Sequence, residues 1–224
     1  MNFFSHGYKY VDQPYMMAGT GVPDWLSYIN RKIRARQRYA EPFMDDVDPQ
    51  IAAVARGIVQ HHLDDHRFHT CLAFTELSLE FAVELRDVLT DEESMRPSFL
   101  GHILVELLLD SHLHQKHPGL LDRYYQALDS VNASVVQSAV NRITSTAKTR
   151  KPMPSTDRIV KVIPGFVSER FLYDYCSNER LLVRLNQVMR RVGLGEIPDD
   201  VLPFFAKARV EVNQRADEML GAVD

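Results

Sequence analysis

Histidine and acidic residues recur at four-residue spacing in two apolar stretches of this chain, and this spacing constrains the fold more than any other feature. The residues are His61, Asp65 and His69 in the first stretch, and His102, Glu106, Asp110 and His114 in the second. An α-helix places side chains four residues apart on one face. We therefore predict that both stretches are helices and that each directs several side chains able to bind a metal towards one point.

The distribution of histidine along the chain is uneven. All nine histidines lie within the segment from His6 to His117, and the rest of the sequence contains none. Random scatter would not produce this partition. We therefore expect any histidine chemistry to lie in the N-terminal half of the chain.

Length and composition indicate a single globular domain. A chain of 224 residues can bury a sizeable core, and a hydrophobic fraction of 45% is ordinary for a globular protein. The net charge of -4 argues against nucleic acid as a partner. Cys71 and Cys176 offer no disulfide framework, and the first residues lack the basic start and long apolar run of a signal peptide. We expect a cytoplasmic protein that does not enter a membrane.

Helical periodicity dominates the sequence, and no run of residues alternates convincingly between apolar and polar. We predict an all-α, single-domain helical bundle over residues 1–224, with a metal-site core over 1–143, a loop over 144–157 and C-terminal helices over 158–224. Helix starts are expected at Pro23-Asp24, Asp48-Pro49 and Arg96-Pro97, and a helix end at His117-Pro118-Gly119. Further helices are expected over 73–89, 119–131, 133–145 after an Asn132 cap, 168–192 and 202–220.

The first histidine stretch places its polar residues on an apolar face. On a helical wheel of about 100° per residue, His61, Asp65 and His69 fall within roughly 80° of one another. The same arc carries Ile51, Val54, Ile58 and Leu72, and the opposite side carries Arg56, Gln60, Asp64 and Arg67. An ionised carboxylate on an inward face is costly unless it is paired or bound to a metal. A lone pair of this kind is usually a hydrogen-bonded core pair, but three such groups favour metal binding.

The second stretch forms a polar stripe about 120° wide on an otherwise apolar helix. A helix that faces solvent also shows one polar stripe. Solvent stripes are usually built from Lys, Arg, Glu and Gln, whereas this one has no basic residue except histidine. We predict that at least one of His102, Glu106 and Asp110 binds a metal. His112 and His117 fit the stripe less well and are expected at the surface.

Three motifs stand in order along the first third of the chain. They are Met1-Asn-Phe-Phe-Ser-His6, Ala18-Gly-Thr-Gly-Val-Pro-Asp24 and Gly57-Ile-Val-Gln-His61-His-Leu-Asp-Asp65. Their order resembles the acyl carrier protein phosphodiesterase family, which has Met-Asn-Phe-x-x-His, a Gly-rich turn leading to Asp, and Gly-Ile-x-x-His-x-x-x-Asp. The resemblance implies an HD-domain-like, metal-dependent phosphohydrolase with His6, Asp24, His61 and Asp65 in its site. Asp110 is similar to the Asp of a later Asp-His motif in that family.

The chain departs from that family's pattern at three places. His62 stands where the family has Arg, Ser111 follows Asp110 where the family has His, and His69 stands where the family has Asp. Either His102 or His112 supplies the missing histidine, or the chain lacks it. The departures leave the metal set and the substrate open.

Mixed imidazole and carboxylate ligands suit Mn, Fe or Zn better than Ca, which prefers oxygen ligands. A divalent ion lowers the pKa of its bound water and neutralises phosphoryl oxygens, so we predict phosphodiester hydrolysis. The resemblance implies that the reaction releases phosphopantetheine from acyl carrier protein. One helix supplies only two or three converging ligands, so we expect His6 or Asp24 to join His61 and Asp65. Asp24 and Asp65 are also candidates for orienting the water, and His66 for protonating the leaving group.

A basic run follows Asp24 in the sequence and comprises Arg31, Lys32, Arg34, Arg36 and Arg38. Its charge would attract an acidic or phosphorylated partner, as an acyl carrier protein would be. The other interpretation is a solvated helix face offset by nearby acidic residues, which are Asp45, Asp46 and Asp48.

Two other classes of protein remain open. The His61/Asp65 and His102/Glu106 pairs also resemble the helices of trinuclear-zinc phospholipase C and P1-type nucleases, which are generally exported. The second class is a non-catalytic helical scaffold or metal-binding protein in which the histidines are structural. Three zinc ions per chain would favour the first class, and metal occupancy without turnover would favour the second.

Overall fold

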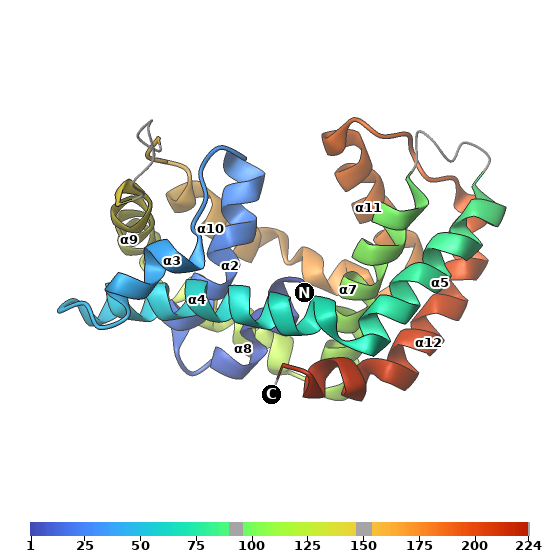
Figure 1. The fold of residues 1–224 in the computed structure, drawn as a ribbon, viewed down its shortest axis with the longest axis horizontal. Helices are drawn as coiled ribbons and strands as arrows, with labels where there is room; N and C mark the ends of the chain where they lie inside the picture. Colours follow the sequence, from blue (N-terminus) through green and yellow to red (C-terminus); the bar gives the residue numbers. More distant parts are fainter. Residues whose placement is uncertain (90–95, 147–153, 224) are drawn as a thin grey trace. The chain divides into compact units, whose positions relative to one another are not determined.

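Helices form the regular structure of the described part of the chain, which comprises residues 1–89, 96–146 and 154–223 of a computed structural model (Figure 1). No strand occurs in these three ranges, so the all-α prediction is confirmed. The α-helices are α1 (Phe3–Gly7), α2 (Pro14–Ile29), α3 (Gln37–Ala40), α4 (Pro49–Thr70), α5 (Leu72–Val88), α7 (Pro97–Lys116), α8 (Leu120–Asp129), α9 (Ala133–Ser145), α10 (Ile159–Glu169), α11 (Asn178–Val192) and α12 (Leu202–Gly221). Short 3-10 helices are η1 (Tyr8–Tyr10), η2 (Glu41–Phe43), η3 (Phe171–Cys176) and η4 (Asp199–Val201). Among the described helices, none combines the length and the apolar character that crossing a bilayer requires.

Local end signals set most helix boundaries as predicted. The backbone N–H of Gln50 donates to Asp48 Oδ1 over 2.9 Å, which caps the start of α4. The N–H of Ser134 donates to Asn132 Oδ1 over 3.0 Å in the same way at the start of α9. Gly119 follows the end of α7 with a φ of 81°, in the left-handed region that favours glycine. The helices predicted over the remaining segments correspond to α5, α8 and α12.

The helix predicted to begin at Pro23-Asp24 begins at Pro14 instead, and Pro23 lies inside α2. Pro14 occupies the first turn, where the missing N–H of proline costs nothing. Pro23 removes one internal hydrogen bond of the helix. The helix nevertheless continues because the residues on both sides, Val22 and Trp25, are buried in the core.

The single helix predicted over 168–192 is wrong, because α10, η3 and α11 occupy that region. The break occurs at Arg170, whose φ of 47° no helix interior can contain. Leu172 and Tyr175 in η3 are buried, so the apolar pattern continues through the break and conceals it. Residues 147–153 of the loop predicted over 144–157 lie outside the described residues.

Contacts between Cα atoms divide the chain into two compact units. Unit 1 comprises Met1, Phe3–His66 and His117–Arg170. Unit 2 comprises Asn2, Arg67–Lys116 and Phe171–Asp224. The predicted single domain and its internal boundaries stay predictions.

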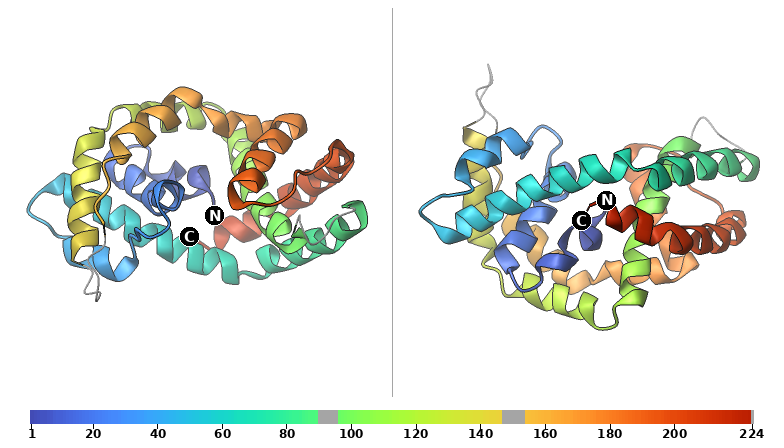
Figure 2. Two further views of the ribbon diagram at one scale, coloured as in Figure 1. Left: turned by 90° about the horizontal axis from the view of Figure 1, so that it is seen from above. Right: turned by 60° about the horizontal axis from the view of Figure 1, so that its bottom comes forward.

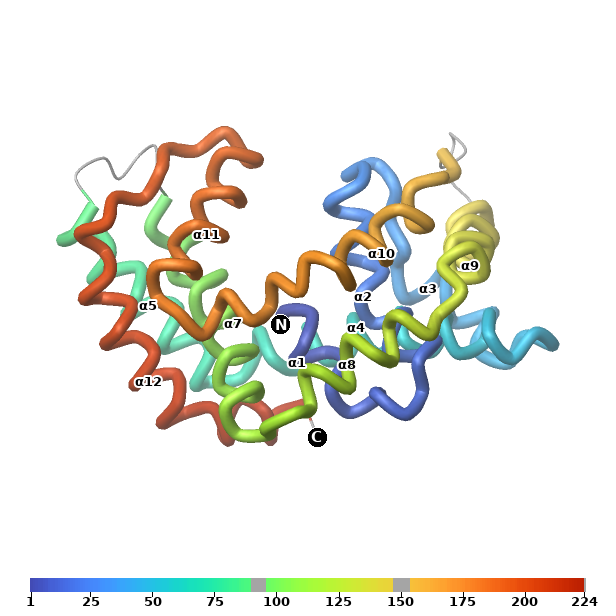
Figure 3. The backbone as a smooth tube through the Cα atoms, turned by 180° about the vertical axis from the view of Figure 1, so that it is seen from behind, coloured from blue at the N-terminus to red at the C-terminus, as the bar shows by residue number. Residues whose placement is uncertain are grey.

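In unit 1, two glycines bring the backbones of α2 and α4 close together. A Cβ atom at Gly57 would lie 2.1 Å from the carbonyl oxygen of Met16, and one at Gly19 would lie 2.4 Å from that of Val54. Only glycine permits so close an approach, which brings the backbone of Thr20 next to α4. The helices α1, α2 and α8 also contact one another in this unit (Figure 3).

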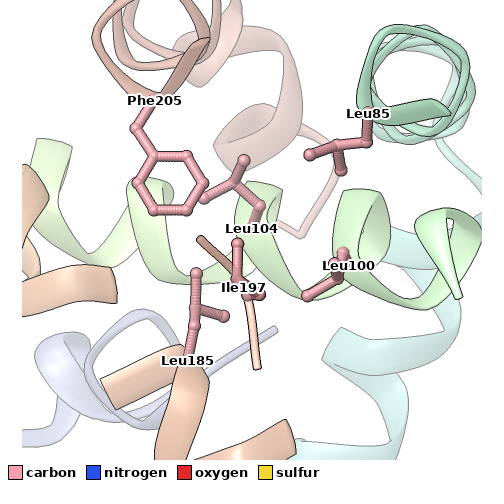
Figure 4. Close-up of a pocket in the computed structure, with 6 residues that line it drawn as sticks. All are labelled: Leu85, Leu100, Leu104, Leu185, Ile197 and Phe205. Carbon is pink, nitrogen blue, oxygen red and sulfur yellow. The ribbon is translucent and has the colours of Figure 1, made fainter. Parts of the chain in front are cut away.

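In unit 2, α5 and α7 lie side by side, and α12 contacts both (Figure 2). A Cβ atom at Gly101 of α7 would lie 2.6 Å from the carbonyl oxygen of Ser78, so glycine permits this packing. The core of the unit includes a small pocket without polar lining (Figure 4), formed by Leu85, Leu100, Leu104, Leu185, Ile197 and Phe205. Such a lining offers no group for catalysis, so the candidate chemistry lies elsewhere.

Candidate metal centres

Unit 1 brings together three of the predicted metal ligands. His6 of α1 and the pair His61 and Asp65 of α4 each offer one ligand atom, and these atoms lie within 4.8 Å of one another. The Nε2 atoms of His6 and His61 lie 3.2 and 3.4 Å from the Oδ1 and Oδ2 atoms of Asp65. The two imidazole rings stack with their centroids 4.1 Å apart. We call this cluster centre 1. It unites the first and the third sequence motifs.

The second nitrogen of each histidine in centre 1 faces an acceptor. His61 Nδ1 lies 2.8 Å from the carbonyl oxygen of Thr20, so it must carry the proton and donate. His6 Nδ1 faces Asp64 Oδ2 at 3.5 Å. Gln60 Nε2 donates to the other oxygen of Asp64 over 2.7 Å. Histidines that bind metals usually donate their other N–H to a carbonyl or carboxylate, so both Nε2 lone pairs are available to an ion.

The geometry of centre 1 fits a divalent ion. Ligand bonds of about 2.0–2.1 Å at a tetrahedral ion place two ligand atoms ~3.3 Å apart, close to the two measured separations from Asp65. His6 Nε2 is buried and lies 3.2 Å from Asp65 Oδ1, its ion-pair partner. A metal ion would take the place of the proton between these two atoms, since imidazole and carboxylate bind metals in their deprotonated forms.

Charge in centre 1 is concentrated on Asp65. Burial alone would raise the pKa of this carboxyl, but His6, His61 and the Met1 amino group, 2.8 Å from Oδ1, together hold its pKa far below the usual range. Burial alone would lower the pKa of His6, but Asp64 and Asp65 raise it above its ordinary value. Asp65 is therefore an anion at any working pH, as a metal ligand must be.

The remaining candidates from unit 1 lie outside this cluster. Asp24 is half-buried in α2, and His61 and His6 are close enough to influence its charge; burial nevertheless raises the pKa of Asp24. His66 lies exposed on α4 and contributes no atom to centre 1. His62 Nε2 lies 2.7 Å from the carbonyl oxygen of Ala35.

The helical wheel was wrong about Asp64. This residue was placed on the outward side of α4, but its exposed fraction is only 5%. The wheel assumes one buried face, whereas α4 is covered on the side of Asp64 as well as on that of His61. Asp64 and the Thr20 carbonyl group are the contributors to centre 1 that the sequence did not reveal.

Unit 2 brings together three further predicted ligands, His69, His102 and Glu106, again with ligand atoms within 4.8 Å of one another. The Nε2 atoms of His69 and His102 lie 2.9 and 3.3 Å from the same oxygen, Glu106 Oε1. The two rings stack at 4.9 Å. We call this cluster centre 2. It joins the end of the first histidine stretch to the second. His69 was predicted to act together with His61 and Asp65, but the structure places it with His102 and Glu106 instead.

Phe74, in the first turn of α5, holds the rings of centre 2. Its ring meets those of His69 and His102 edge-on, with centroids 5.0 and 4.9 Å away. Burial alone would raise the pKa of Glu106, but hydrogen bonds from His102 and His69 contribute to lowering it. Centre 2 therefore also combines an ionised carboxylate with two imidazoles.

Asp110 does not join either centre. Its Oδ2 atom accepts a hydrogen bond of 2.7 Å from Asn2 Nδ2, and the residue is buried. His112 was expected at the surface, but it is half-buried and its Nδ1 lies 3.0 Å from Asn213 Oδ1. His117 is exposed, as expected.

Comparison with known proteins identifies no relative. No protein family matches the chain, and no curated protein or solved structure matches it.

Proposed function

We propose that the protein is a metal-dependent phosphodiester hydrolase that holds its catalytic ion at centre 1. The observation that carries this proposal is the convergence of two Nε2 atoms and one carboxylate within 4.8 Å. Three protein ligands are the usual number at catalytic sites, where the remaining position belongs to water or substrate. Asp65 is the exposed member of the cluster, with 31% of its side chain accessible, so the ion would face solvent on that side.

The donor set of centre 1 suits Mn, Fe or Zn better than Ca or Mg, because two of its three donors are imidazole nitrogens. Such an ion supplies a water of lowered pKa and neutralises charge on phosphoryl oxygens. The chain's own contribution is rigid positioning, since Thr20 and Asp64 fix both imidazoles.

Asp24 is a candidate for orienting the water, and it could also exchange a proton. Burial raises its pKa, and a carboxyl with a raised pKa can exchange a proton closer to neutral pH than an ordinary aspartate. It has no hydrogen bond or ion pair among the described residues that would tie up its oxygens. His66, exposed on the same helix as His61, is the second candidate for protonating the leaving group.

The proposed substrate is a phosphopantetheinylated carrier protein, and the proposed class is the HD-like phosphohydrolases. The three sequence motifs that resemble the acyl carrier protein phosphodiesterases support both, since two of them meet in centre 1. The basic run offers a docking surface in the same unit, because all five of its cationic side chains are exposed; they are Arg31, Lys32, Arg34, Arg36 and Arg38. Acidic partners are attracted by such a surface.

The test uses metal-free protein reconstituted separately with Mn, Fe, Zn and Mg. Cleavage of bis(p-nitrophenyl) phosphate and of phosphopantetheinylated carrier protein is measured for wild type, His61→Ala and Asp65→Ala. Both variants should lose turnover while circular dichroism remains that of wild type. His117→Ala, which removes an exposed histidine outside both centres, should keep full activity.

Activity that survives equally in both variants would overturn the proposal. Metal bound at centre 1 without turnover on any phosphodiester would favour a non-catalytic metal-binding protein. Three zinc ions per chain would favour the trinuclear-zinc class instead.

A further inference from the structure

We infer that centre 2 is a second, separate metal site that binds a zinc-type divalent ion through His69, His102 and Glu106 and keeps one coordination position open to solvent. All three residues belong to unit 2, whereas the three ligands of centre 1 belong to unit 1. The inference does not depend on the reaction proposed for centre 1.

The ligand atoms of centre 2 are already arranged around one point. Both Nε2 atoms face the same oxygen of Glu106, at 2.9 and 3.3 Å. These separations are near the ~3.3 Å edge of a tetrahedral zinc site. The set of two histidines and one glutamate is one that zinc uses at catalytic sites with an open position. Calcium and magnesium are disfavoured because they prefer oxygen ligands.

Three chain segments fix the arrangement. His69 lies in the last turn of α4, and the four-residue spacing on α7 places His102 beside Glu106. Phe74 contacts both imidazoles edge-on, which restricts the rotation of the rings. Side chains that are already held in this way lose less conformational entropy when they bind an ion.

Centre 2 is open to solvent on the side of its two imidazoles. The side chains of His69 and His102 are 31% and 46% exposed, whereas that of Glu106 is 15% exposed. An ion there would bind the shielded carboxylate of Glu106 on one side. Its other side, next to the two imidazoles, would be accessible to solvent. Water, or an exogenous anion such as inorganic phosphate, would fill its fourth position.

The competing explanation is structural: Glu106 accepts hydrogen bonds from two histidines and no ion binds. Glu106→Gln separates the two explanations. Glutamine keeps an oxygen that accepts from His69 and has nearly the same volume, but it lacks the anionic ligand. Replacement of residues that merely support metal ligands costs ~10–100-fold in affinity, so loss of this direct ligand should cost more than about 100-fold.

The experiment measures zinc stoichiometry and affinity by competition with a chromophoric chelator, in protein carrying His61→Ala to disable centre 1. We expect one zinc per chain in this background, and none after Glu106→Gln or His102→Ala is added. Adding His117→Ala instead should leave the zinc in place. With cobalt in place of zinc, inorganic phosphate should change the visible absorption if the fourth position is open.

Absence of stoichiometric zinc in the His61→Ala background would overturn the inference. So would an unchanged zinc affinity after Glu106→Gln. A cobalt spectrum indifferent to phosphate would overturn the open position. None of these outcomes bears on turnover, which depends on centre 1, so failure of centre 2 and failure of the proposed hydrolase are distinguishable.

Discussion

Centre 1 and centre 2 both combine two imidazoles with one carboxylate, but a different type of ligand is exposed to solvent in each. In centre 1 the side chains of His6 and His61 are 0% and 4% exposed, and the carboxylate is the accessible ligand. In centre 2 the imidazoles are accessible, and the carboxylate of Glu106 is the shielded ligand. The protein therefore buries the histidines in one centre and the carboxylate in the other.

This difference determines how much support each imidazole receives. In centre 1, the protein provides an acceptor for the Nδ1 atom of each histidine, through the Thr20 carbonyl oxygen and the Asp64 carboxylate. In centre 2, no described residue bonds to the corresponding atom of His69 or His102. Centre 1 should therefore bind its ion more tightly and be the centre on which turnover depends.

The largest expected effect is the loss of activity in Asp65→Asn. Asparagine keeps the shape of the side chain, but it removes the anion on which both imidazoles of centre 1 converge. Metal affinity at centre 1 and the rate of phosphodiester cleavage should each fall by more than about 100-fold. Chelator competition and steady-state kinetics measure the two quantities.

The matched variant is Glu106→Gln, which makes the same chemical change in centre 2. It should leave the rate of cleavage within about twofold of wild type, since centre 2 has no part in the proposed reaction. If Glu106→Gln reduced turnover as strongly as Asp65→Asn, the assignment of separate roles to the two centres would be wrong.

The next largest effect concerns stability. It is expected at Gly57, where α4 packs closely against α2. Gly57→Ala would place a Cβ atom 2.1 Å from the carbonyl oxygen of Met16, and backbone cannot yield as a flexible side chain can. We expect a loss of about 3 kcal/mol in the free energy of unfolding, the upper part of the range for overpacking. Urea denaturation of metal-free protein measures it.

Gly165→Ala is the control, because a Cβ atom there meets nothing within 4 Å. Alanine inside a helix is favoured over glycine by ~0.5–1 kcal/mol, so this variant should be as stable as wild type or slightly more stable. Gly101→Ala tests unit 2, where the nearest atom is 2.6 Å away, and it should weaken zinc binding at centre 2 rather than at centre 1. Equal stability of Gly57→Ala and Gly165→Ala would show that the backbones of α2 and α4 do not approach so closely.

The parts of this structure that sequence predicts are those set by local spacing. Asp48 and Asn132 cap helices through bonds to residues two positions away, and His61 meets Asp65 across one helical turn. The stripe on α7 shows the limit of such reasoning. Each four-residue step on a helix advances by ~40°, so Asp110 lies ~80° around α7 from His102 and one turn beyond Glu106, and it bonds to Asn2 instead.

Contacts between distant segments are harder to predict. His6 entered the candidate site only through the resemblance of its motif, because no local spacing links α1 to α4. The burial of Asp64 depends on packing around α4, which a helical wheel cannot represent. Helix α2 was misjudged because its glycines indicate a turn by themselves, whereas they serve the close contact with α4.

A smaller effect is expected from Asp64→Asn. Asparagine keeps an oxygen that accepts from Gln60, but it weakens the hold on His6 Nδ1 because the acceptor loses its charge. Metal affinity at centre 1 should fall by ~10–100-fold, as for other residues that support a ligand, and affinity at centre 2 should not change. Asp12→Asn, which removes an exposed ion pair with Arg123, is the control and should affect neither centre. An unchanged affinity in Asp64→Asn would mean that His6 needs no such support.

The smallest effect concerns the pH dependence of metal-free protein. The pKa of His6 is raised in the folded state by Asp64 and Asp65, against the opposing effect of burial. A raised pKa means that protonated His6 stabilises the fold fully below about pH 6.5, its unfolded value, and that this stability is lost as pH rises through the folded value. The free energy of unfolding should therefore decline above about pH 6.5, by at most ~1.4 kcal/mol per pH unit.

Urea denaturation between about pH 6 and 9 measures this slope. The difference between wild type and His6→Gln isolates the contribution of the residue, and His117→Gln should retain the wild-type slope. Saturating zinc should reverse the trend at centre 1, because an ion binds the neutral imidazole and competes with the proton. Metal-free wild type and His6→Gln could instead show the same change of stability with pH. Asp64 and Asp65 would then not hold a proton on His6, and the buried histidines of centre 1 would not be supported as proposed.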